Sequence, residues 1–437
     1  MADPIVVRLK EKSIKKLSLG RRIEGITGRE RLLLMEVQEL SLMSAARLAG
    51  PVSLTMRLKL RRLRRFLGRV LLTELCMPIY TPLVYHDRDI TIDTIQESMA
   101  HSMFRFRTKE HLRRVYTALK IPAVVKLDNG GLIHGEKYFL ISLYRMAFPH
   151  RWPDVALVFG IHWTVCSRCS THFFKFMNVR WSYLITNNLN YWKSSLPEFA
   201  NCIRQKITDK YAINYIDANE PGGFVVFGFI DDTLNPMCRP FGGPQTDGVD
   251  AERYAKEIQQ AFYTGWKKLH GMKYQTINLP NGMIMDAFGG SMRRNDNQYL
   301  NASHILDRLA TLQLNDLQQY VIYGDSAFGW DTHLRSRYAD GAADPLTAAE
   351  INENVAMSAM RQSIEWDYKD VKTRWALIDY KKMLKLGQAK VVDIFMTAML
   401  LSNILSTLIG NQSSQYFSCM PPTLEDYLSQ GPRDLVN

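Results

Sequence analysis

The chain has 437 residues, of which 46% are hydrophobic and 22% are charged. This length predicts two or three domains, and the hydrophobic content is ample for packed cores. The formal net charge of +12 indicates a polyanionic partner. Six unevenly spaced cysteines in so long a chain exclude a disulfide framework and favour the reducing interior of a cell. The N-terminus has no compact apolar region after its charges, so we expect no secretory signal.

The positive charge is concentrated at the N-terminus. Residues 1–69 contain 17 Lys and Arg against 6 Asp and Glu, whereas the remaining residues contain 38 against 37. We therefore predict that residues 1–95 form a basic N-terminal arm that binds nucleic acid or directs nuclear import. Within it, residues 56–72 combine seven Lys and Arg with leucines at helical spacing, which predicts a basic amphipathic helix. A solvated, weakly ordered tail is the alternative interpretation.

The next segment, residues 96–215, has the pattern of a helical module. One helix is expected to begin near Thr108, with Glu110 in its first turn, and a second covers residues 137–148 and stops before Pro149. Both have apolar residues on one face, which predicts that the helices pack together.

A helix-turn-helix pattern follows inside this module. Pro153 is placed where a helix can begin, and Gly160 can supply the positive φ of a tight turn. The pattern predicts an inner face formed by Val155, Ala156, Phe159, Ile161, Cys166 and Cys169. The exposed residues of the second helix are then His162, Trp163, Thr164, Ser167, Arg168 and His172. Of these, Thr164, Ser167 and Arg168 are our candidates for contacts with DNA. An ordinary helical hairpin is the alternative, because this pattern is common by chance.

The second half of the chain alternates between predicted strands and helices, which favours an α/β or mixed-sheet domain over residues 216–410. The expected strands are 224–230, 273–279, 283–288 and 319–324, and the clearest helices are 252–266 and one through Glu365. Residues 391–410 are apolar enough to suggest a membrane span, but their polar residues favour a buried helix, so no membrane partner is expected. Residues 411–437 are expected to form a C-terminal tail.

Carboxylates stand at defined points in this domain. Asp231 and Asp232 follow the apolar run 224–230, and Asp296 follows a glycine turn. Glu365 has the spacing of a helix residue, flanked by Arg361 and Lys372. Carboxylates at the ends of buried strands and on a facing helix can hold two divalent metals for phosphodiester chemistry. The pattern therefore predicts a metal-dependent nuclease or transposase.

Several strings in this region resemble a known family. GFIDDT, WKKLHGMKYQTINLPNGMI, the glycine turn before Asp296, YGDSAF and RQSIEWDYKDVKTRW together resemble the catalytic domain of PIF/Harbinger-type DDE transposases, which include the Harbinger transposase-derived nucleases. The resemblance runs from about residue 220 to 410, and the upstream helices look like that family's N-terminal module. It implies an α/β, RNase H-like DDE catalytic domain preceded by the helix-turn-helix module.

The resemblance also implies roles for individual residues. Asp231 matches the first catalytic Asp, Asp296 the second and Glu365 the closing Glu, and Asp325 matches a further metal ligand. All four would hold Mg²⁺ or Mn²⁺. Asp232 is the immediate rival of Asp231. Arg361 and Lys372 would hold DNA phosphates, or Arg361 would pair with the acidic residues. Related bacterial transposases carry a Tyr where this chain has Ser358.

The expected function is a hydrolase that cuts, and can join, DNA phosphodiesters in DNA transposition. Its partner would be double-stranded DNA, both transposon ends and target site. The resemblance further suggests a Myb-like accessory DNA-binding protein, a homo-oligomer and a location in the nucleus. The alternative is a host-adopted protein that binds DNA without cleaving it.

Overall fold

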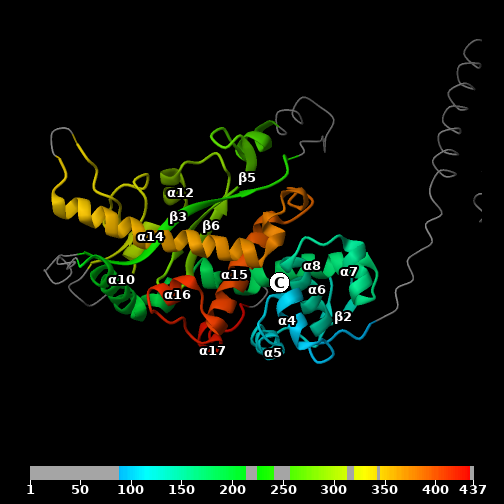
Figure 1. The fold of residues 1–437 in the computed structure, drawn as a ribbon. Coiled ribbons are helices and arrows are strands. Elements are labelled where there is room, and N and C mark those ends of the chain that lie inside the picture. The colour runs from blue at the N-terminus through cyan, green and yellow to red at the C-terminus, as the bar shows by residue number, and fades with distance from the viewer. Residues whose placement is uncertain (1–87, 213–223, 241–255, 313–318, 342–344, 434–437) are drawn as a thin grey trace, which may run out of the picture. The chain divides into compact units, whose positions relative to one another are not determined.

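The computed structural model describes residues 88–212, 224–240, 256–312, 319–341 and 345–433 (Figure 1). These residues all fall within one compact unit. Nearly all of the predicted basic arm, including the amphipathic helix at 56–72, lies outside the described residues. So does the predicted boundary between residues 215 and 216. The division into arm, module, nuclease domain and tail therefore stays a prediction.

The first part of the described chain is mainly helical, as its pattern predicts. A short antiparallel hairpin of β1 (Val124–Lys126) and β2 (Leu132–His134) accompanies the helices. The α-helices are α4 (Glu97–Phe104), α5 (Lys109–Ala118), α6 (Gly135–Ala147), α7 (Trp152–Phe159), α8 (Trp163–Trp181), α9 (Leu189–Trp192) and α10 (Leu196–Tyr211). The predicted start of α5 is confirmed, because the Thr108 side chain accepts a hydrogen bond from the backbone N–H of His111. Short 3-10 helices, η2 (Ser182–Ile185) and η3 (Lys193–Ser195), flank α9.

Helices α7 and α8 are joined by the expected glycine turn. Gly160 has φ 67°, and its N–H bonds the carbonyl of Ala156 to close α7. The predicted inner residues Val155, Ala156, Phe159, Cys166 and Cys169 are buried, whereas Ile161 is only partly buried. The two helices and the turn are therefore confirmed as local structure.

A mixed sheet forms the centre of the second part. Its strands are β3 (Phe224–Pro236), β4 (Tyr263–Thr264), β5 (Leu269–Asn278), β6 (Ile284–Gly290), β7 (Gln319–Tyr323) and β8 (Leu334–Arg335). The main strand order is β6-β5-β3-β7-β8, with β4 pairing the start of β5. β3 is antiparallel to β5 and parallel to β7. β5 and β6 are antiparallel, and β7 and β8 are parallel.

The strand predictions 283–288 and 319–324 are confirmed, and the other two are too short. The predicted strand 273–279 belongs to β5, which already begins at Leu269. We expected the run 224–230 to end before Asp231, but β3 continues to Pro236. Antiparallel pairing with β5 carries the polar residues along, with Asp231 opposite Thr276 and Asp232 opposite Gln275. The predicted helix 252–266 is wrong at its end. Residues 256–261 are helical, but residues 263 and 264 pair with β5.

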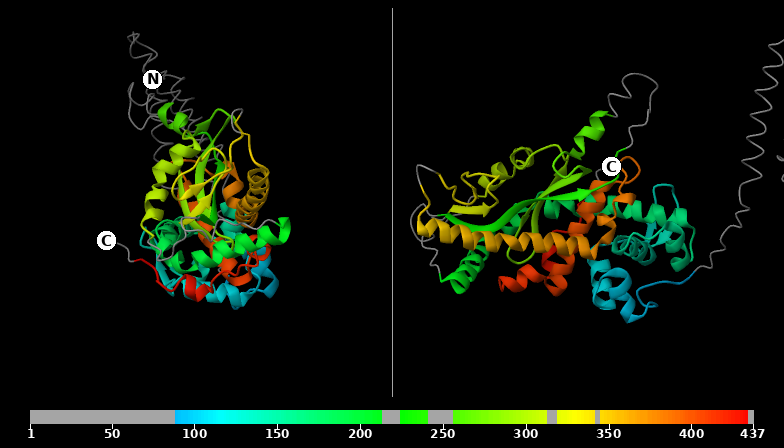
Figure 2. Two further views of the ribbon diagram at one scale, coloured as in Figure 1. Left: turned by 90° about the vertical axis from the view of Figure 1, so that its left-hand side faces the viewer. Right: turned by 45° about the horizontal axis from the view of Figure 1, so that its top comes forward.

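Helices cover both faces of the sheet. They are α12 (Asp296–Ser303), α13 (Ile305–Ala310), α14 (Ala348–Arg374), α15 (Val391–Ile409), α16 (Gln412–Tyr416) and α17 (Leu424–Tyr427). Tyr368 of α14 bonds Thr276 on one face of the sheet, and Tyr274 on that face stacks against Phe395 of α15. Arg308 of α13 pairs with Asp286 on the other face. Figures 1 and 2 show α14 running across β3.

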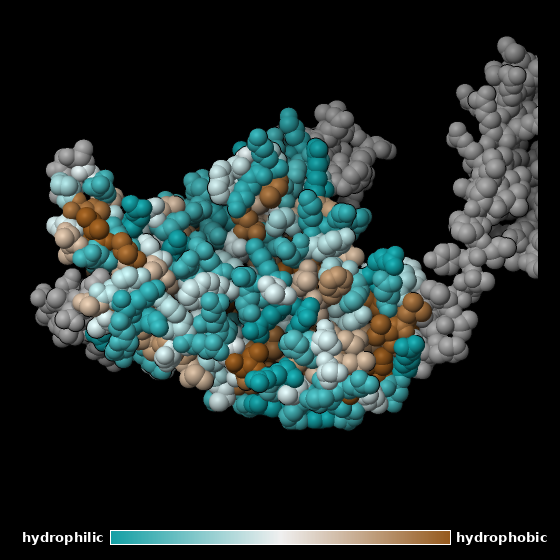
Figure 3. All heavy atoms as spheres, viewed as in Figure 1, coloured by the Kyte–Doolittle hydropathy of each residue, from teal (hydrophilic) through white to brown (hydrophobic). Residues whose placement is uncertain are grey.

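The long helix α14 begins at a complete capping box. The Thr347 side chain accepts from the N–H of Glu350, and the Glu350 side chain accepts from the N–H of Thr347. Its first half exposes Ile351 and Val355 to solvent. On the face drawn in Figure 3, hydrophobic atoms gather at this same end of the molecule.

Helix α15 is long and apolar enough to cross a membrane by length and composition, but 72% of its apolar window is buried inside the protein. Asn403 explains its polar content. Its side chain accepts from the N–H of Ile284 and donates to the carbonyl of Ile284, and it also donates to the hydroxyl of Tyr427 at 2.8 Å. A buried core helix, as predicted, accounts for these contacts.

The segment after α15 packs closely on the rest of the unit. The ring of Tyr416 lies 5.1 Å from that of Trp366 on α14, and the Ser413 hydroxyl donates to buried Asp367 at 2.7 Å. Tyr427 is fully buried, and Arg433 bonds the carbonyl of Arg180 through its backbone N–H. Residues 411–433, which we assign to a tail, thus contribute to the core.

Candidate functional site

Asp231 lies within β3 on the side that faces α14. Its carboxylate pairs with the guanidinium of Arg361 at 3.0 Å, and its carbonyl accepts a hydrogen bond from the Tyr368 hydroxyl at 2.7 Å. Both partners come from α14, so this helix fixes the carboxylate from one side. Arg361 therefore pairs with the acidic group, which was one of its two expected roles.

Asp325 is brought beside Asp231 by the parallel pairing of β3 and β7. Tyr323, the last residue of β7, is the register partner of Phe229 in β3. Asp325 follows Tyr323 by two residues, and Asp231 follows Phe229 by two residues. Neighbouring parallel strands that continue in step carry these two carboxylates to the same place along the sheet. Asp325 itself is held in a turn, where its Oδ1 accepts from the N–H of Ala327 at 2.9 Å.

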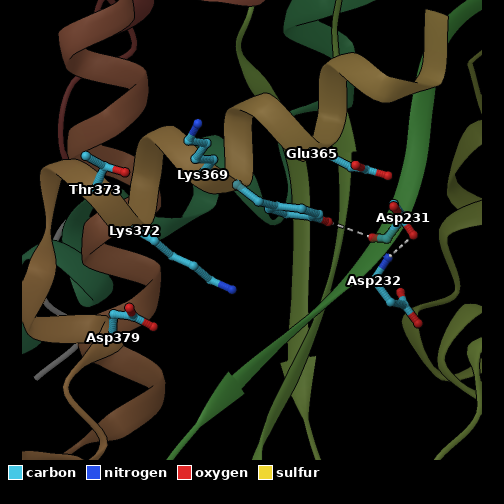
Figure 4. A pocket seen from close by; sticks show the side chains of 8 residues that line it. Asp231, Asp232, Glu365, Lys369, Lys372, Thr373 and Asp379 are labelled. Carbon is cyan, nitrogen blue, oxygen red and sulfur yellow. Dashed lines mark hydrogen bonds between the residues drawn. The ribbon is translucent and has the colours of Figure 1, made fainter. Parts of the chain in front are cut away.

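Glu365 comes from the exposed side of α14, one helical turn after Arg361. Its carboxylate points toward Asp231 across the gap between helix and strand (Figure 4). Burial raises the pKa of Asp231, Arg361 opposes that shift, and the negative charges of Asp325 and Glu365 raise the pKa further. The three carboxylates therefore form one electrostatic group.

A cavity of about 600 Å³ opens beside this group. The residues that line it are Asp231, Asp232, Glu365, Tyr368, Lys369, Lys372, Thr373 and Asp379. Lys372 reaches into it from α14, with its ammonium 3.3 Å from the Thr233 hydroxyl and 3.2 Å from the carbonyl of Leu234. Burial lowers the pKa of Lys372. The cavity thus has Asp231 and Glu365 at one end and Lys372 at the other, where the carboxylate of Asp379 lies beside the lysine and opposes the lowering of its pKa (Figure 4).

Asp296 does not join this group, and the expected meeting of Asp231, Asp296 and Glu365 is not what the structure shows. Asp296 is the first residue of α12, and its carboxylate pairs with the ammonium of Lys273. The same ammonium lies 2.7 Å from a carboxylate oxygen of Asp232. Successive side chains of a strand point to opposite faces, so Asp231 and Asp232 belong to different clusters.

The cluster around Lys273 is buried and largely neutralised. The side chains of Lys273 and Asp232 are each only 7% exposed. Burial raises the pKa of Asp232 to about 7, which Lys273 counteracts and the charge of Asp296 reinforces. Burial acts to lower the pKa of Lys273, but Asp232 and Asp296 outweigh it and raise that pKa. One cation shared by two carboxylates is the arrangement of a structural ion pair.

Two residues beside the site, Tyr368 and Asp367, were not predicted from the sequence. Tyr368 links Asp231 to Thr276, since its hydroxyl bonds both residues at 2.7 Å. Asp367, fully buried beside it, accepts from the side chains of Asn278 and Ser413. Both residues follow Glu365 within one helical turn, so helical spacing alone marks them as neighbours. Their partners on β5 and α16 could not be inferred from spacing.

The candidate DNA contacts of the helix-turn-helix lie on α8. Arg168 is exposed, whereas Thr164 and Ser167 are half-buried. The Thr164 hydroxyl lies 2.8 Å from Nδ1 of His162, which caps the helix. His172, which we expected to be exposed, is half-buried and lies 2.9 Å from the Tyr138 hydroxyl. The first turns of α8 therefore present Arg168 more freely than the other candidates.

The donor chemistry of the Asp231 group fits a hard divalent cation. Mg²⁺ and Mn²⁺ prefer carboxylate oxygen ligands, and Asp231, Asp325 and Glu365 supply only such ligands. Three carboxylates face a single guanidinium, so the group keeps a negative excess. As the side chains stand, no three His, Cys, Asp or Glu residues in the described part of the chain converge on one point. The guanidinium of Arg361 occupies one carboxylate oxygen of Asp231, so a metal that takes this oxygen would displace Arg361.

Comparison with known proteins gave one family match. Residues 247–403 match the family described as DDE superfamily endonuclease. The matched region contains Asp296, Asp325 and Glu365, while Asp231 precedes it and is joined to it by the pairing of β3 with β5 and β7. Searches of curated proteins and of solved structures gave no match.

Proposed function

We propose that this protein is a divalent-metal-dependent DNA endonuclease or transposase whose acidic set is Asp231, Asp325 and Glu365. The observation that carries the proposal is that Asp231 and Glu365 line one cavity, and that Asp325 at the end of β7 lies near enough for its charge to act on Asp231. The match of residues 247–403 to a DDE superfamily endonuclease supports the same activity. Asp296, which the resemblance suggested as the second catalytic Asp, is assigned instead to the structural ion pair with Lys273.

An RNase H-like fold of the PIF/Harbinger type is part of this proposal. The strand order β6-β5-β3-β7-β8 supports it, with three antiparallel strands followed by two parallel ones. In this order the central strand carries the first carboxylate and its parallel neighbour the second. The helix that lies across them contributes the third.

The residues of the site have separate tasks in such a reaction. Asp231, Asp325 and Glu365 would hold Mg²⁺ or Mn²⁺, which when bound would stabilise the attacking and leaving oxygens of an in-line displacement at phosphorus. Tyr368 holds the backbone of Asp231 against α14. Lys372 and Lys369 place positive charge on the opposite side of the cavity, where a DNA phosphate can bind as a point-charge partner.

DNA recognition is assigned to other elements. Arg168, with Thr164 and Ser167, is proposed to contact double-stranded DNA from α8, and the basic arm would add affinity that is independent of sequence. The Myb-like accessory protein, the homo-oligomer and the nuclear location remain proposals that rest on the resemblance.

The test is metal-dependent nicking of supercoiled DNA by the full chain. We expect Mg²⁺ or Mn²⁺ to activate nicking, a chelator to stop it, and Glu365→Gln to abolish it without loss of DNA affinity. The amide keeps the volume of the side chain but removes the charge that a metal needs.

The alternative is a non-cleaving DNA-binding protein derived from such an enzyme. The ion pair between Arg361 and Asp231 favours it, because the guanidinium occupies one of the oxygens that a metal would take. Failure of the wild-type protein to nick DNA with either metal, together with intact DNA binding, would establish this alternative. Arg361→Ala would then be the variant in which to look for restored metal binding.

A further inference from the structure

The turn between β4 and β5 exposes a tryptophan that is followed by two lysines. Trp266 is 81% exposed, more than any other large hydrophobic residue in the described part of the chain. The ammonium of Lys267 lies 4.7 Å from the centre of its ring, and Lys268 follows at a positive φ of 51°. So exposed an indole contributes little to the core, and its two cationic neighbours suit a polyanion.

This turn lies beside the cavity of the acidic site. Lys372, which lines that cavity, contacts the carbonyl of Leu234 at 3.2 Å, and Pro236, two residues further along β3, pairs with Gly271 just after the turn. The chain just after β3 joins the same region. The N–H of Met237 bonds the carbonyl of His270 in β5, and the N–H of Cys238 bonds the carbonyl of Leu384.

The 3-10 helix η6 (Lys381–Met383) is thereby held close to the turn. Its residues Lys381 and Lys382 are exposed, and the carbonyl of Lys381 accepts from the Cys238 thiol at 3.1 Å. We call Trp266, Lys267, Lys268, Lys381 and Lys382 the basic rim. Its five residues include four lysines, against the single carboxylate of Asp379 at this end of the cavity.

We propose that the basic rim binds the DNA strand that flanks the cleaved phosphate, with Trp266 stacking on an unpaired base of that strand. The preferred ligand is thus a DNA end with unpaired nucleotides. This inference rests on the proposed function, because the rim matters to cleavage only if the neighbouring carboxylates act on DNA. Every base has a π-face, so an exposed indole beside phosphate-binding lysines suits a single strand of any sequence.

The test compares two short duplexes of the same sequence, one blunt and one with a single-stranded overhang that carries 2-aminopurine. Binding to the full chain is measured in a chelator, so that no cleavage occurs. We expect about tenfold tighter binding of the overhang duplex, in the range for one stacked base, together with quenching of 2-aminopurine. The blunt duplex is lengthened until both ligands carry the same number of phosphates, so that the sequence-independent contribution of the basic arm and α8 is matched in this ratio.

The variants assign the preference to the indole. Trp266→Ala should remove both the preference and the quenching while leaving blunt-duplex affinity within about twofold, and Trp266→Phe should keep most of both. Trp330→Ala is the matched control. Trp330 is 49% exposed and contacts Arg335, which stacks on Phe224 at the other end of β3. Lys267→Ala should weaken binding of both duplexes and reduce the salt slope by about 0.7–0.9.

Equal binding of the two duplexes by the wild type would overturn the inference, and so would an unchanged preference in Trp266→Ala. The outcome is separable from that of the nicking assay. A protein that prefers overhangs through Trp266 but never nicks DNA contradicts the proposed nuclease and supports the single-strand site. A protein that nicks DNA but shows no overhang preference that depends on Trp266 contradicts only the proposed single-strand site.

Discussion

Asp231 and Asp232 are adjacent in the chain, yet they face opposite sides of β3 and have opposite surroundings. Asp231 faces α14, where two further carboxylates and one guanidinium leave a negative excess beside an open cavity. Asp232 faces α12, where it shares the ammonium of Lys273 with Asp296. Asp232 and Lys273 are almost closed to solvent, and Asp296 is about one-third exposed. An acidic residue next to a cavity keeps its charge available to a ligand. One that is buried with its counter-ion is closed to a ligand instead.

The two ion pairs also differ in their exposure to solvent. The pair of Asp231 with Arg361 is about one-fifth exposed on each side, so water and ions can replace either partner. The pair of Asp232 with Lys273 has no such access, and loss of one partner leaves a buried charge. The exposure of the side chains therefore predicts that the pair of Asp231 with Arg361 can break to admit a metal, and that the pair of Asp232 with Lys273 stays intact.

The largest expected effect comes from neutralising one carboxylate in each cluster. Asp325→Asn should lower the rate of metal-dependent nicking by about a thousandfold, roughly 4 kcal/mol in activation free energy, whereas Asp296→Asn should change it less than about threefold. The reason is that only Asp325 belongs to the electrostatic group of Asp231 and Glu365. Single-turnover nicking of supercoiled DNA measures the rates, and thermal unfolding checks that both variants fold. The reverse ranking would restore Asp296 as the catalytic residue.

Removing the cation of each cluster should affect stability in the opposite order, with the larger loss in the Lys273 cluster. Lys273→Met is expected to reduce the free energy of unfolding by about 3–5 kcal/mol, because it leaves Asp232 buried without its counter-ion. Arg361→Met should cost no more than about 1 kcal/mol, because the pair is partly screened by solvent. Urea unfolding followed by circular dichroism measures both. A larger loss for Arg361→Met would show that the Asp231 pair is the structural one.

The two aspartates should also differ in their effect on the pH dependence of stability. The pKa of Asp232 is about 7 in the folded chain and near 3.9 when unfolded, so the unfolded state loses its proton first as the pH rises. This group therefore lowers the free energy of unfolding between about pH 4 and pH 7, by roughly 2–4 kcal/mol in all. Asp232→Asn should remove that part of the decline. The free energy of unfolding is measured across this pH range for the wild type, for Asp232→Asn and for Asp231→Asn as the companion variant. Parallel curves for the wild type and Asp232→Asn would contradict the assignment.

The smallest effect concerns the approach of β7 to β3. A methyl group added at Gly324 would lie 2.7 Å from the Phe328 ring and 3.0 Å from Ile230, so Gly324→Ala must shift the turn that holds Asp325. We expect a loss of about 1–3 kcal/mol in unfolding free energy and a fall in nicking rate of about tenfold. Gly265→Ala is the control, because its added methyl would meet no atom within 4 Å. Wild-type nicking by Gly324→Ala would mean that the position of Asp325 is not critical.

Local patterns in the sequence were sufficient for much of the fold. The cap at Thr108, the glycine turn at Gly160 and the apolar runs that became β5, β6 and β7 each depend on residues close together in the chain. The helix through Glu365 was likewise predictable, since a helix buries residues at regular spacing. The acidic character of the site was visible too, because Asp231, Asp325 and Glu365 all stood among the candidates.

The tertiary structure decided which carboxylates meet. A shift of one residue along a strand reverses the face that a side chain occupies, so no local pattern could separate Asp231 from Asp232. The choice between Asp296 and Asp325 depended on which segment pairs in parallel with β3, a contact across about ninety residues of chain. The sequence by itself determined the elements and the supply of acidic groups, because those follow from short-range periodicity. Strand pairing and helix packing alone determined the site, because they join residues that the chain keeps far apart.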